Sequence, residues 1–125
     1  LQAAAELKAH EIMSSNYLKK AKLEKDLRNC LKAGKLFALA ADITKNMEHA
    51  LEAAACFSKV EEFPKAKEYA ILAQKWNPDS PRGSLALARV YISAGLSNRA
   101  RSILTEMLEK WPGNKDAVRL LKDLK

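Results

Sequence analysis

Apolar and polar residues alternate along the second half of this chain with the spacing of amphipathic helices. Apolar side chains recur every three or four positions, which places them on one face of a helix. These stripes predict helices within 47–60, 64–76, 81–94, 97–110 and 115–124. Proline and glycine fall between them, where helices are expected to end or begin. The pattern therefore predicts an all-helical structure for this region.

The same pattern is written twice, 34 residues apart. Five residue pairs carry it: Leu51 and Leu85, Ala54 and Ala88, Phe57 and Tyr91, Ala66 and Ala100, and Pro78 and Pro112. A fixed period of this size is typical of stacked helical hairpins. The four alanines are expected where the two helices of a hairpin approach closely, with the aromatic residues beside them. Ala38, by contrast, is placed on a less crowded surface.

Local signals mark the helix ends. Ser80 and Ser97 are expected to be N-caps, and Gly95 is expected to end the helix between them. The last helix, 115–124, is expected to bury three apolar residues: Val118, Leu121 and Leu124. Lys122 and Lys125 replace the small and aromatic residues of the earlier copies, which predicts a polar outer face that keeps the end of the array soluble.

Residues 1–46 do not follow this register, because lysines stand 34 positions before Ala54 and Ala66. Apolar stripes still predict helices, and Gly34 is the clearest stop. The segment 14–16 either separates two helices or lies within one long helix. We favour a degenerate helical hairpin that packs on the first repeat.

The start of the first repeat has two possible positions. One helical stripe allows its opening helix to begin as early as Lys35. Alternatively, the chain breaks at 44–46 and Asn46 caps the next helix.

From Met47 onward the chain resembles the tetratricopeptide repeat family. The resemblance rests on the small residue of the first helix, the aromatic residue three positions later, the alanine of the second helix and the closing proline. It implies an all-α fold, a right-handed superhelix of antiparallel hairpins. The implied units are an N-terminal segment (1–46), two repeats (47–80 and 81–114) and a capping helix (115–125). The repeats diverge from the family at Ala50 and Ser84, where a large residue is usual.

The resemblance also implies a function. Members of the family usually bind partners in a concave groove that the first helices line. Carried over position by position, this implies seven groove residues: Leu51, Ala55, Arg82, Leu85, Arg89, Ile92 and Arg119. Arginine forks suit carboxylates and backbone carbonyls, although these arginines can equally be ordinary surface charges. The expected function is a non-catalytic scaffold that binds a protein or peptide, with an acidic partner as one candidate.

One specialised form of this binding is not expected. A subset of the family holds the carboxyl terminus of chaperones with lysine and asparagine side chains in the groove. The comparable positions here are Leu51, Ala55 and Leu85, so the sequence predicts that this clamp is absent.

Charge suggests a rival function. The net charge is +7, distributed as +4 over 1–46, −2 over 47–80 and +5 over 81–125. Basic ends attract acidic partners, or they are simply solvated. Nucleic-acid binding is the alternative, carried by Lys19, Lys20, Lys22, Lys25, Arg28, Lys32 and Lys35. It is disfavoured because these residues scatter around the helix and only Tyr17 is interleaved.

No catalytic or metal-binding motif stands out. His10 and His49 are isolated, and Cys30 and Cys56 are expected to be free thiols in the core. We therefore expect no enzyme activity and no cofactor. The lack of a signal peptide or a long apolar run predicts a cytoplasmic chain with no membrane partner. We also expect it to be a domain of a larger protein, with a homodimer as a further possibility through the N-terminal apolar stripe.

Overall fold

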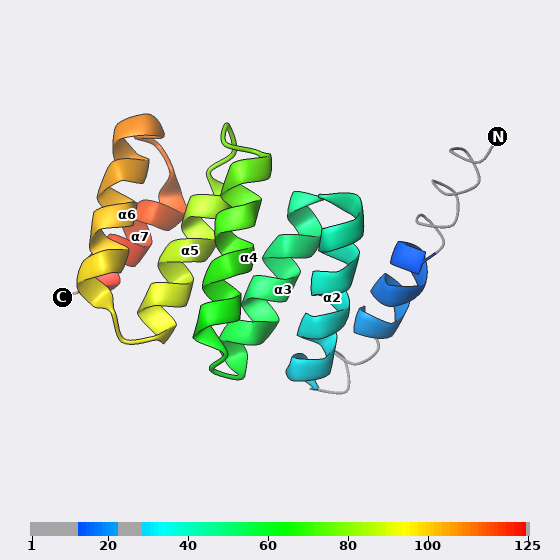
Figure 1. Ribbon diagram of the computed structural model, residues 1–125. Coiled ribbons are helices and arrows are strands. Elements are labelled where there is room, and N and C mark those ends of the chain that lie inside the picture. Colours follow the sequence, from blue (N-terminus) through cyan, green and yellow to red (C-terminus); the bar gives the residue numbers. More distant parts are fainter. Residues whose placement is uncertain (1–12, 23–28, 125) are drawn as a thin grey trace.

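The computed structural model describes residues 13–22 and 29–124, and every regular element in these residues is a helix. A helix over residues 13–22 stands at one end of a row of helices (Figure 1). The others follow in chain order: α2 (Cys30–Thr44), α3 (Met47–Lys59), α4 (Phe63–Trp76), α5 (Arg82–Ser93), α6 (Ser97–Lys110) and α7 (Lys115–Asp123). None of the helices in these two described ranges has the length and apolarity needed to cross a bilayer.

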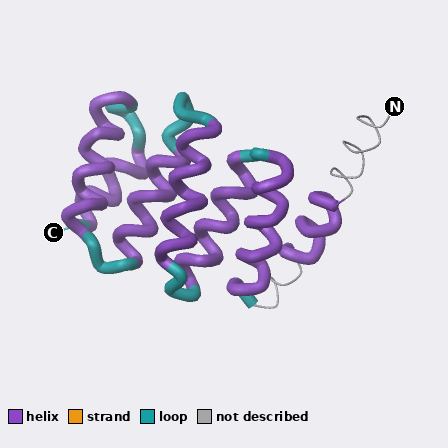
Figure 2. The backbone as a smooth tube through the Cα atoms, in the orientation of Figure 1, coloured by secondary structure: helices purple, strands orange, loops and turns teal. Residues whose placement is uncertain are grey.

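Successive helices are antiparallel, because the turns that connect them lie alternately at the upper and the lower edge of the row (Figure 2). Each helix from α2 to α7 packs against the next one in the chain. In addition, α3 contacts α5 directly, so the first helices of two consecutive hairpins stack on each other. The fold is an all-α solenoid of helical hairpins, as the sequence predicts.

The core is built mainly from alanines, and small side chains let helices pack closely. Ala54, Ala66, Ala88 and Ala100 are all buried, with at most 1% of their surface exposed. This burial agrees with the prediction that they lie between helices. Phe57 is also buried, and its ring centroid lies 6.1 Å from that of Tyr69.

The N-terminal region repeats the pattern at a spacing of 33 residues, not 34. Ala21 and Ala33 are fully buried, and they stand 33 positions before Ala54 and Ala66. The described part of residues 1–46 thus does not follow the 34-residue register, as expected, but it has equivalent buried alanines at a spacing of 33. One residue fewer in the chain hides the match, although the same small residues fill the same places.

The expectation that Gly34 stops a helix was wrong. Gly34 lies inside α2 and is buried. A Cβ atom at this position would lie 3.2 Å from two ring carbons of Phe57 and 3.3 Å from the Cβ of Cys56. The glycine therefore allows close packing of α2 on α3, and the α2 helix continues to Thr44.

The two alternatives for the first repeat are resolved in favour of a break at 44–46. Asn46 is the N-cap of α3, and its side-chain Oδ1 accepts a hydrogen bond from the backbone N–H of Glu48 at 2.8 Å. Lys45, just before it, takes the left-handed conformation with φ 54°. This residue ends α2 and turns the chain into α3.

Predictions of helix ends had mixed outcomes. Gly95 has φ 80° and follows the end of α5, as expected of a glycine cap. Ser80 accepts a hydrogen bond from the N–H of Arg82 at 3.3 Å, although Pro81 holds the N-cap position. Ser97 was wrongly assigned as a cap, because it is the first residue of α6 and Leu96 precedes it as an N-cap without a side-chain hydrogen bond.

Two burial predictions were wrong. Val118 is 37% exposed, because α7 buries Ala117 and turns Leu121 and Leu124 partly toward the core beside α6. Ala38 is only 8% exposed and belongs to the core, because α2 is packed on both sides.

Candidate functional site

A groove lies between the two stacked first helices, α3 and α5. Its volume is about 390 Å³, and its lining residues all come from these two helices. The lining residues are Leu51, Glu52, Ala54, Ala55, Ser58, Lys59, Arg82, Leu85, Ala86, Arg89, Val90 and Ser93. The 34-residue period places equivalent positions of the two helices on opposite walls.

Five of the seven residues predicted from the sequence line this groove: Leu51, Ala55, Arg82, Leu85 and Arg89. Their role in binding stays a prediction. The groove is also lined by two residues that were not predicted from the sequence, Glu52 and Lys59, and by their partners one period later, Ala86 and Ser93. The 34-residue period could have indicated these residues, because both pairs flank the predicted groove positions on the same helical face.

The groove has an apolar floor and a polar rim. Ala54, Leu85 and Val90 are buried, with 8% exposure or less, and Leu51 is half-buried. The charged residues Lys59, Arg82 and Arg89 are exposed. Ligand sites commonly combine an apolar surface with a few polar groups that orient the ligand.

Arg82 is already paired with a carboxylate. Its Nη2 donates a hydrogen bond to Oε2 of Glu48 at 2.9 Å, and its Nη1 donates to Oε1 of the same side chain. The hydrogen bond between the two side chains lowers the pKa of Glu48 and raises the pKa of Arg82. Arg82 is therefore not an unpaired cation in this structure.

Arg89 and Lys59 are the unpaired cations of the groove. Neither has a hydrogen-bond or ion-pair partner among the residues that the structure describes. Glu52 contributes one negative charge to the same lining. The groove thus offers two unpaired positive groups beside an apolar floor.

Comparisons with known proteins locate the fold but not the family. No protein-family model matches the sequence, and no curated protein matches it. Solved structures do match. The TPR domain of Arabidopsis OM64 has a TM-score of 0.75 and 19% identity, covering 92% of this chain and 96% of that domain.

Two further structures are similar over nearly the whole chain. The second TPR domain of human RPAP3, in complex with the HSP70 peptide SGPTIEEVD, has a TM-score of 0.75 and 15% identity, covering 94% of this chain and 97% of that one. The first TPR of Spaghetti (RPAP3), bound to the HSP90 peptide SRMEEVD, has a TM-score of 0.73 and 15% identity, covering 90% of each chain.

This chain has the tetratricopeptide repeat (TPR) fold. At such low identity, the similarity establishes the arrangement of helices and nothing about the ligand.

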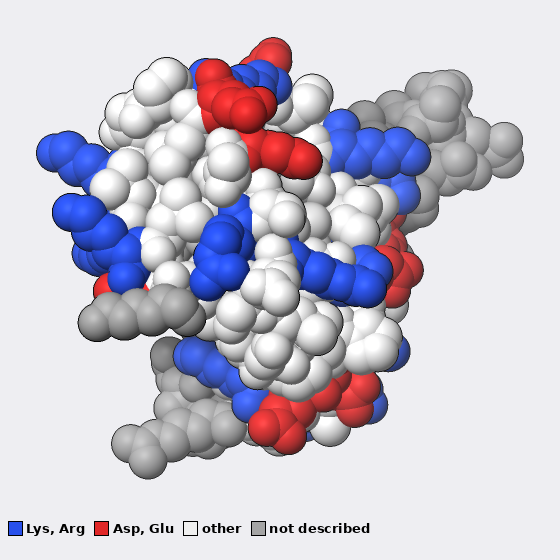
Figure 3. All heavy atoms as spheres, turned by 90° about the vertical axis from the view of Figure 1, so that its left-hand side faces the viewer, with Lys and Arg blue, Asp and Glu red and all other residues white. Residues whose placement is uncertain are grey.

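Two of the predicted groove residues lie elsewhere on the TPR fold. Ile92 is half-buried in α5 and does not line the groove. Arg119 borders a separate depression on α7 and donates a hydrogen bond to Asp116 at 2.7 Å. Lys115 and Lys122 line the same depression. Figure 3, which faces the end formed by α6 and α7, shows basic side chains spread over this face, with acidic side chains among them. The groove ends before α7 because α7 is packed on α6, while direct stacking of first helices is seen for α3 and α5.

The other candidate groups are two histidines and two cysteines. No cluster of metal-ligating side chains occurs within 13–22 and 29–124, and His10 lies outside these ranges. His49 Nδ1 lies 2.9 Å from Thr44 Oγ1, and burial lowers its pKa. Cys56 is buried in α3 and Cys30 is half-buried at the start of α2, and the structure shows no disulfide between them.

The basic N-terminal residues can be followed only in part. Lys19, Lys20 and Lys22 are exposed on the helix 13–22, and Lys32 and Lys35 are exposed on α2. Lys25 and Arg28 lie outside the described residues. Nucleic-acid binding and homodimer formation therefore stay predictions.

Proposed function

We propose that this chain is a non-catalytic interaction scaffold that binds a segment of another protein in the groove between α3 and α5. The observation that carries the proposal is the pairing of an apolar floor, Leu51 and Leu85, with the unpartnered Arg89 on the same face. The stacking of α3 on α5 holds the two walls at a fixed separation.

The chemistry of the groove indicates how such a segment binds. An apolar side chain of the ligand rests on Leu51 and Leu85, where it displaces water from the floor. The guanidinium of Arg89 donates hydrogen bonds to a carboxylate or a backbone carbonyl of the ligand. Ser58 and Ser93 add hydroxyl groups at the rim, which can bond to the ligand backbone.

The charge of the groove favours an acidic ligand. Arg89 and Lys59 are unpaired, whereas Glu52 is the single carboxylate among the lining residues. A negatively charged segment therefore gains from approaching this surface, and the gain decreases as salt is added. The peptides named for Spaghetti and for human RPAP3 are both acidic, which is consistent with a TPR fold serving such ligands.

The test uses synthetic peptides of equal length in three pools, acidic, neutral and basic, each peptide containing one leucine. Binding is measured by fluorescence anisotropy for the wild type and for the double variant Leu85→Asp, Arg89→Glu. We expect the acidic pool to bind the wild type most tightly and the double variant at least about tenfold more weakly, a loss of about 1.4 kcal/mol.

A matched control separates the groove from general surface charge. The variant Ile71→Asp, Lys75→Glu makes the same changes in charge, four positions apart, at exposed residues of α4 that do not line the groove. We expect it to bind as the wild type does. Because Leu85 is buried, Arg89→Glu alone is tested as well, and circular dichroism verifies that each variant is folded. Equal binding by the wild type and a folded Arg89→Glu variant would contradict the proposal.

A further inference from the structure

Arg82 lies on the groove wall with its guanidinium already holding a carboxylate of the same chain. The two-pronged contact with Glu48 is the geometry in which arginine also recognises acidic ligands. Both side chains are about half exposed, at 52% for Arg82 and 55% for Glu48. The pair is therefore accessible from the groove and is not locked in the core.

Helix stability does not explain why an arginine stands at this position. Arg82 is the first residue of α5, where the exposed N–H groups make the helix end positive and disfavour a cation. Glu48 lies one period earlier, in the first turn of α3, where its charge is favourable. The repeat places the two side chains next to each other, and the cation at position 82 is satisfied only through an anion from another helix.

We propose that Glu48 is an internal competitor, whose carboxylate occupies on Arg82 the place that a carboxylate of an acidic ligand takes when that ligand fills the groove. The inference rests on the proposed function and specifies its ligand: a segment with at least two acidic groups and an apolar side chain between them. One acidic group is for Arg82 and the other for Arg89, with the apolar side chain on Leu51 and Leu85.

The spacing of the two arginines sets the length of this segment. Arg82 and Arg89 are seven positions apart on one face of α5, which corresponds to about 10 Å along a helix. An extended chain covers that distance in about three residues. The segment that fits is therefore short, and its acidic groups are separated by about two residues.

Exchange of one carboxylate for another is feasible because the Glu48–Arg82 pair is exposed, and exposed ion pairs contribute little to stability. Arg82 keeps the same number of charge-assisted hydrogen bonds after the exchange. A neutral ligand leaves the Glu48–Arg82 pair in place and is not affected by the competition. Glu48 thus lowers affinity specifically for ligands whose carboxylate takes its place on Arg82.

The experiment is a double-mutant cycle with the acidic peptide pool as the probe. Dissociation constants are measured by anisotropy for the wild type, Glu48→Gln, Arg82→Gln and the variant that carries both changes. We expect Glu48→Gln to tighten binding about two- to fivefold, the range that follows from releasing one exposed ion pair. In the Arg82→Gln background the same change is expected to have almost no effect.

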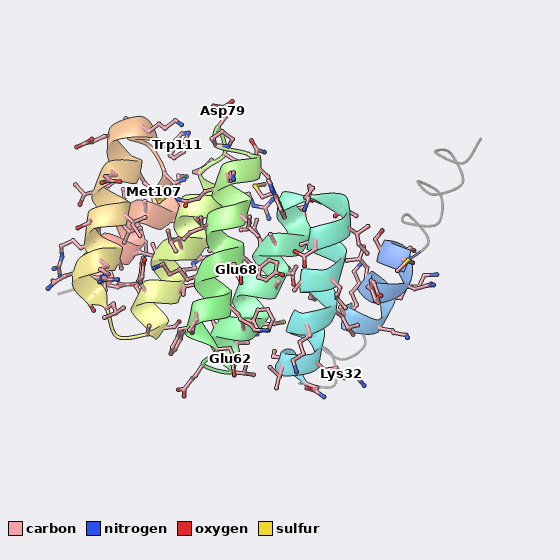
Figure 4. The ribbon with its side chains drawn as sticks, viewed as in Figure 1. Lys32, Glu62, Glu68, Asp79, Met107 and Trp111 are labelled. Carbon is pink, nitrogen blue, oxygen red and sulfur yellow. The ribbon has the colours of Figure 1, made fainter. Side chains whose placement is uncertain are left out.

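The control is Glu68→Gln, which removes the same charge from α4, outside the groove lining (Figure 4). It should leave binding unchanged. The inference is overturned if Glu48→Gln fails to tighten binding, or if it tightens binding equally in the presence and absence of Arg82. The last result would mean that only the overall charge matters.

Failure of the proposed function gives a different result. If the acidic pool binds equally to the wild type and to folded Arg89→Glu, the groove is not the site, whatever Glu48→Gln does. If Arg89→Glu weakens binding but Glu48→Gln has no effect, the groove function stands and the competitor role is wrong. If no variant binds the pool, both are contradicted.

Discussion

The two hairpins α3–α4 and α5–α6 follow one sequence pattern but meet their neighbours differently. At equivalent positions one period apart, α3 has His49, whose ring is half-buried beside the end of α2, whereas α5 has Gly83. A Cβ atom at Gly83 would lie 2.6 Å from the backbone N and 2.7 Å from the Cα of Gln74 in α4. The joint between α4 and α5 is therefore much closer than the joint between α2 and α3 at the same position.

The second helices of the two hairpins, α4 and α6, differ in the size of their buried side chains. The inner positions of α4 hold Ala70 and Ala73, whereas the equivalent positions of α6 hold Leu104 and Met107. All four residues are buried. The difference teaches that the period fixes where a residue must be buried, and that the distance to the neighbouring helix decides how large it can be.

The largest expected effect comes from placing the same side chain, alanine, at the equivalent positions 83 and 49 of the two joints. Gly83→Ala should lower the free energy of unfolding by about 3 kcal/mol, because the added methyl group meets backbone atoms that cannot rotate away. The matched change His49→Ala should cost less, since its joint already accepts a large side chain. Urea unfolding followed by circular dichroism measures both, and equal losses would show that the two joints are equally close.

A somewhat smaller effect tests the alanines between helices. Ala88→Leu is expected to cost about 1–3 kcal/mol by overpacking. Ala88 shares a core cluster with Ala117 of α7, so hydrogen exchange should also become faster in α7. Ala55→Leu is the control, because Ala55 is exposed in the groove. Similar melting temperatures for the two variants would contradict the register assigned to the repeats.

The turns within the two hairpins offer a test with effects of opposite sign. Glu61 has φ 63°, and the residue one period later is Gly95, with φ 80°. Residues other than glycine are strained in this conformation. We therefore expect Glu61→Gly to stabilise the fold by about 0.5 kcal/mol and Gly95→Ala to destabilise it by about 1 kcal/mol. Thermal melts measure both, and shifts of the same sign would be inconsistent with this account.

The smallest effect concerns pH and depends on His49, for which the second hairpin has no counterpart. Burial lowers the pKa of His49 below its ordinary value of 6.5; Glu48 acts against this shift and Lys22 adds to it. The unfolded chain therefore binds a proton more readily than the folded chain. Stability should decrease slightly as pH falls below about 6.5 and should be fully present above it. Unfolding titrations of His49→Gln should lack this component, and an identical pH profile would exclude it.

Much of the fold could be predicted because the 34-residue period marks both hairpins directly. A degenerate N-terminal hairpin was expected, but its register escaped prediction for two physical reasons. Only Lys45 and Asn46 connect α2 to α3, which shifts the period by one residue. Gly34 was read as a stop, because nothing in the local sequence shows that the ring of Phe57 will pack against it.

The groove was predictable to the extent that it follows the period. Leu51 and Leu85 were found because they are equivalent positions on the first helices. The pairing of Arg82 with Glu48 was missed, although their opposite charges one period apart carried the signal. Arg119, one period after Leu85, lines a separate depression on α7, and its role in binding stays a prediction.

Packing of each helix on its immediate neighbour has a consequence for how the chain folds. Contacts between α3 and α4 join residues close in sequence, as do those between α5 and α6. Little loop entropy is lost before such contacts form, which favours rapid folding. A hairpin such as α3–α4 can bury Ala54 against its partner helix while later helices are still leaving the ribosome. Folding can therefore start in one hairpin and spread to its neighbours along the array.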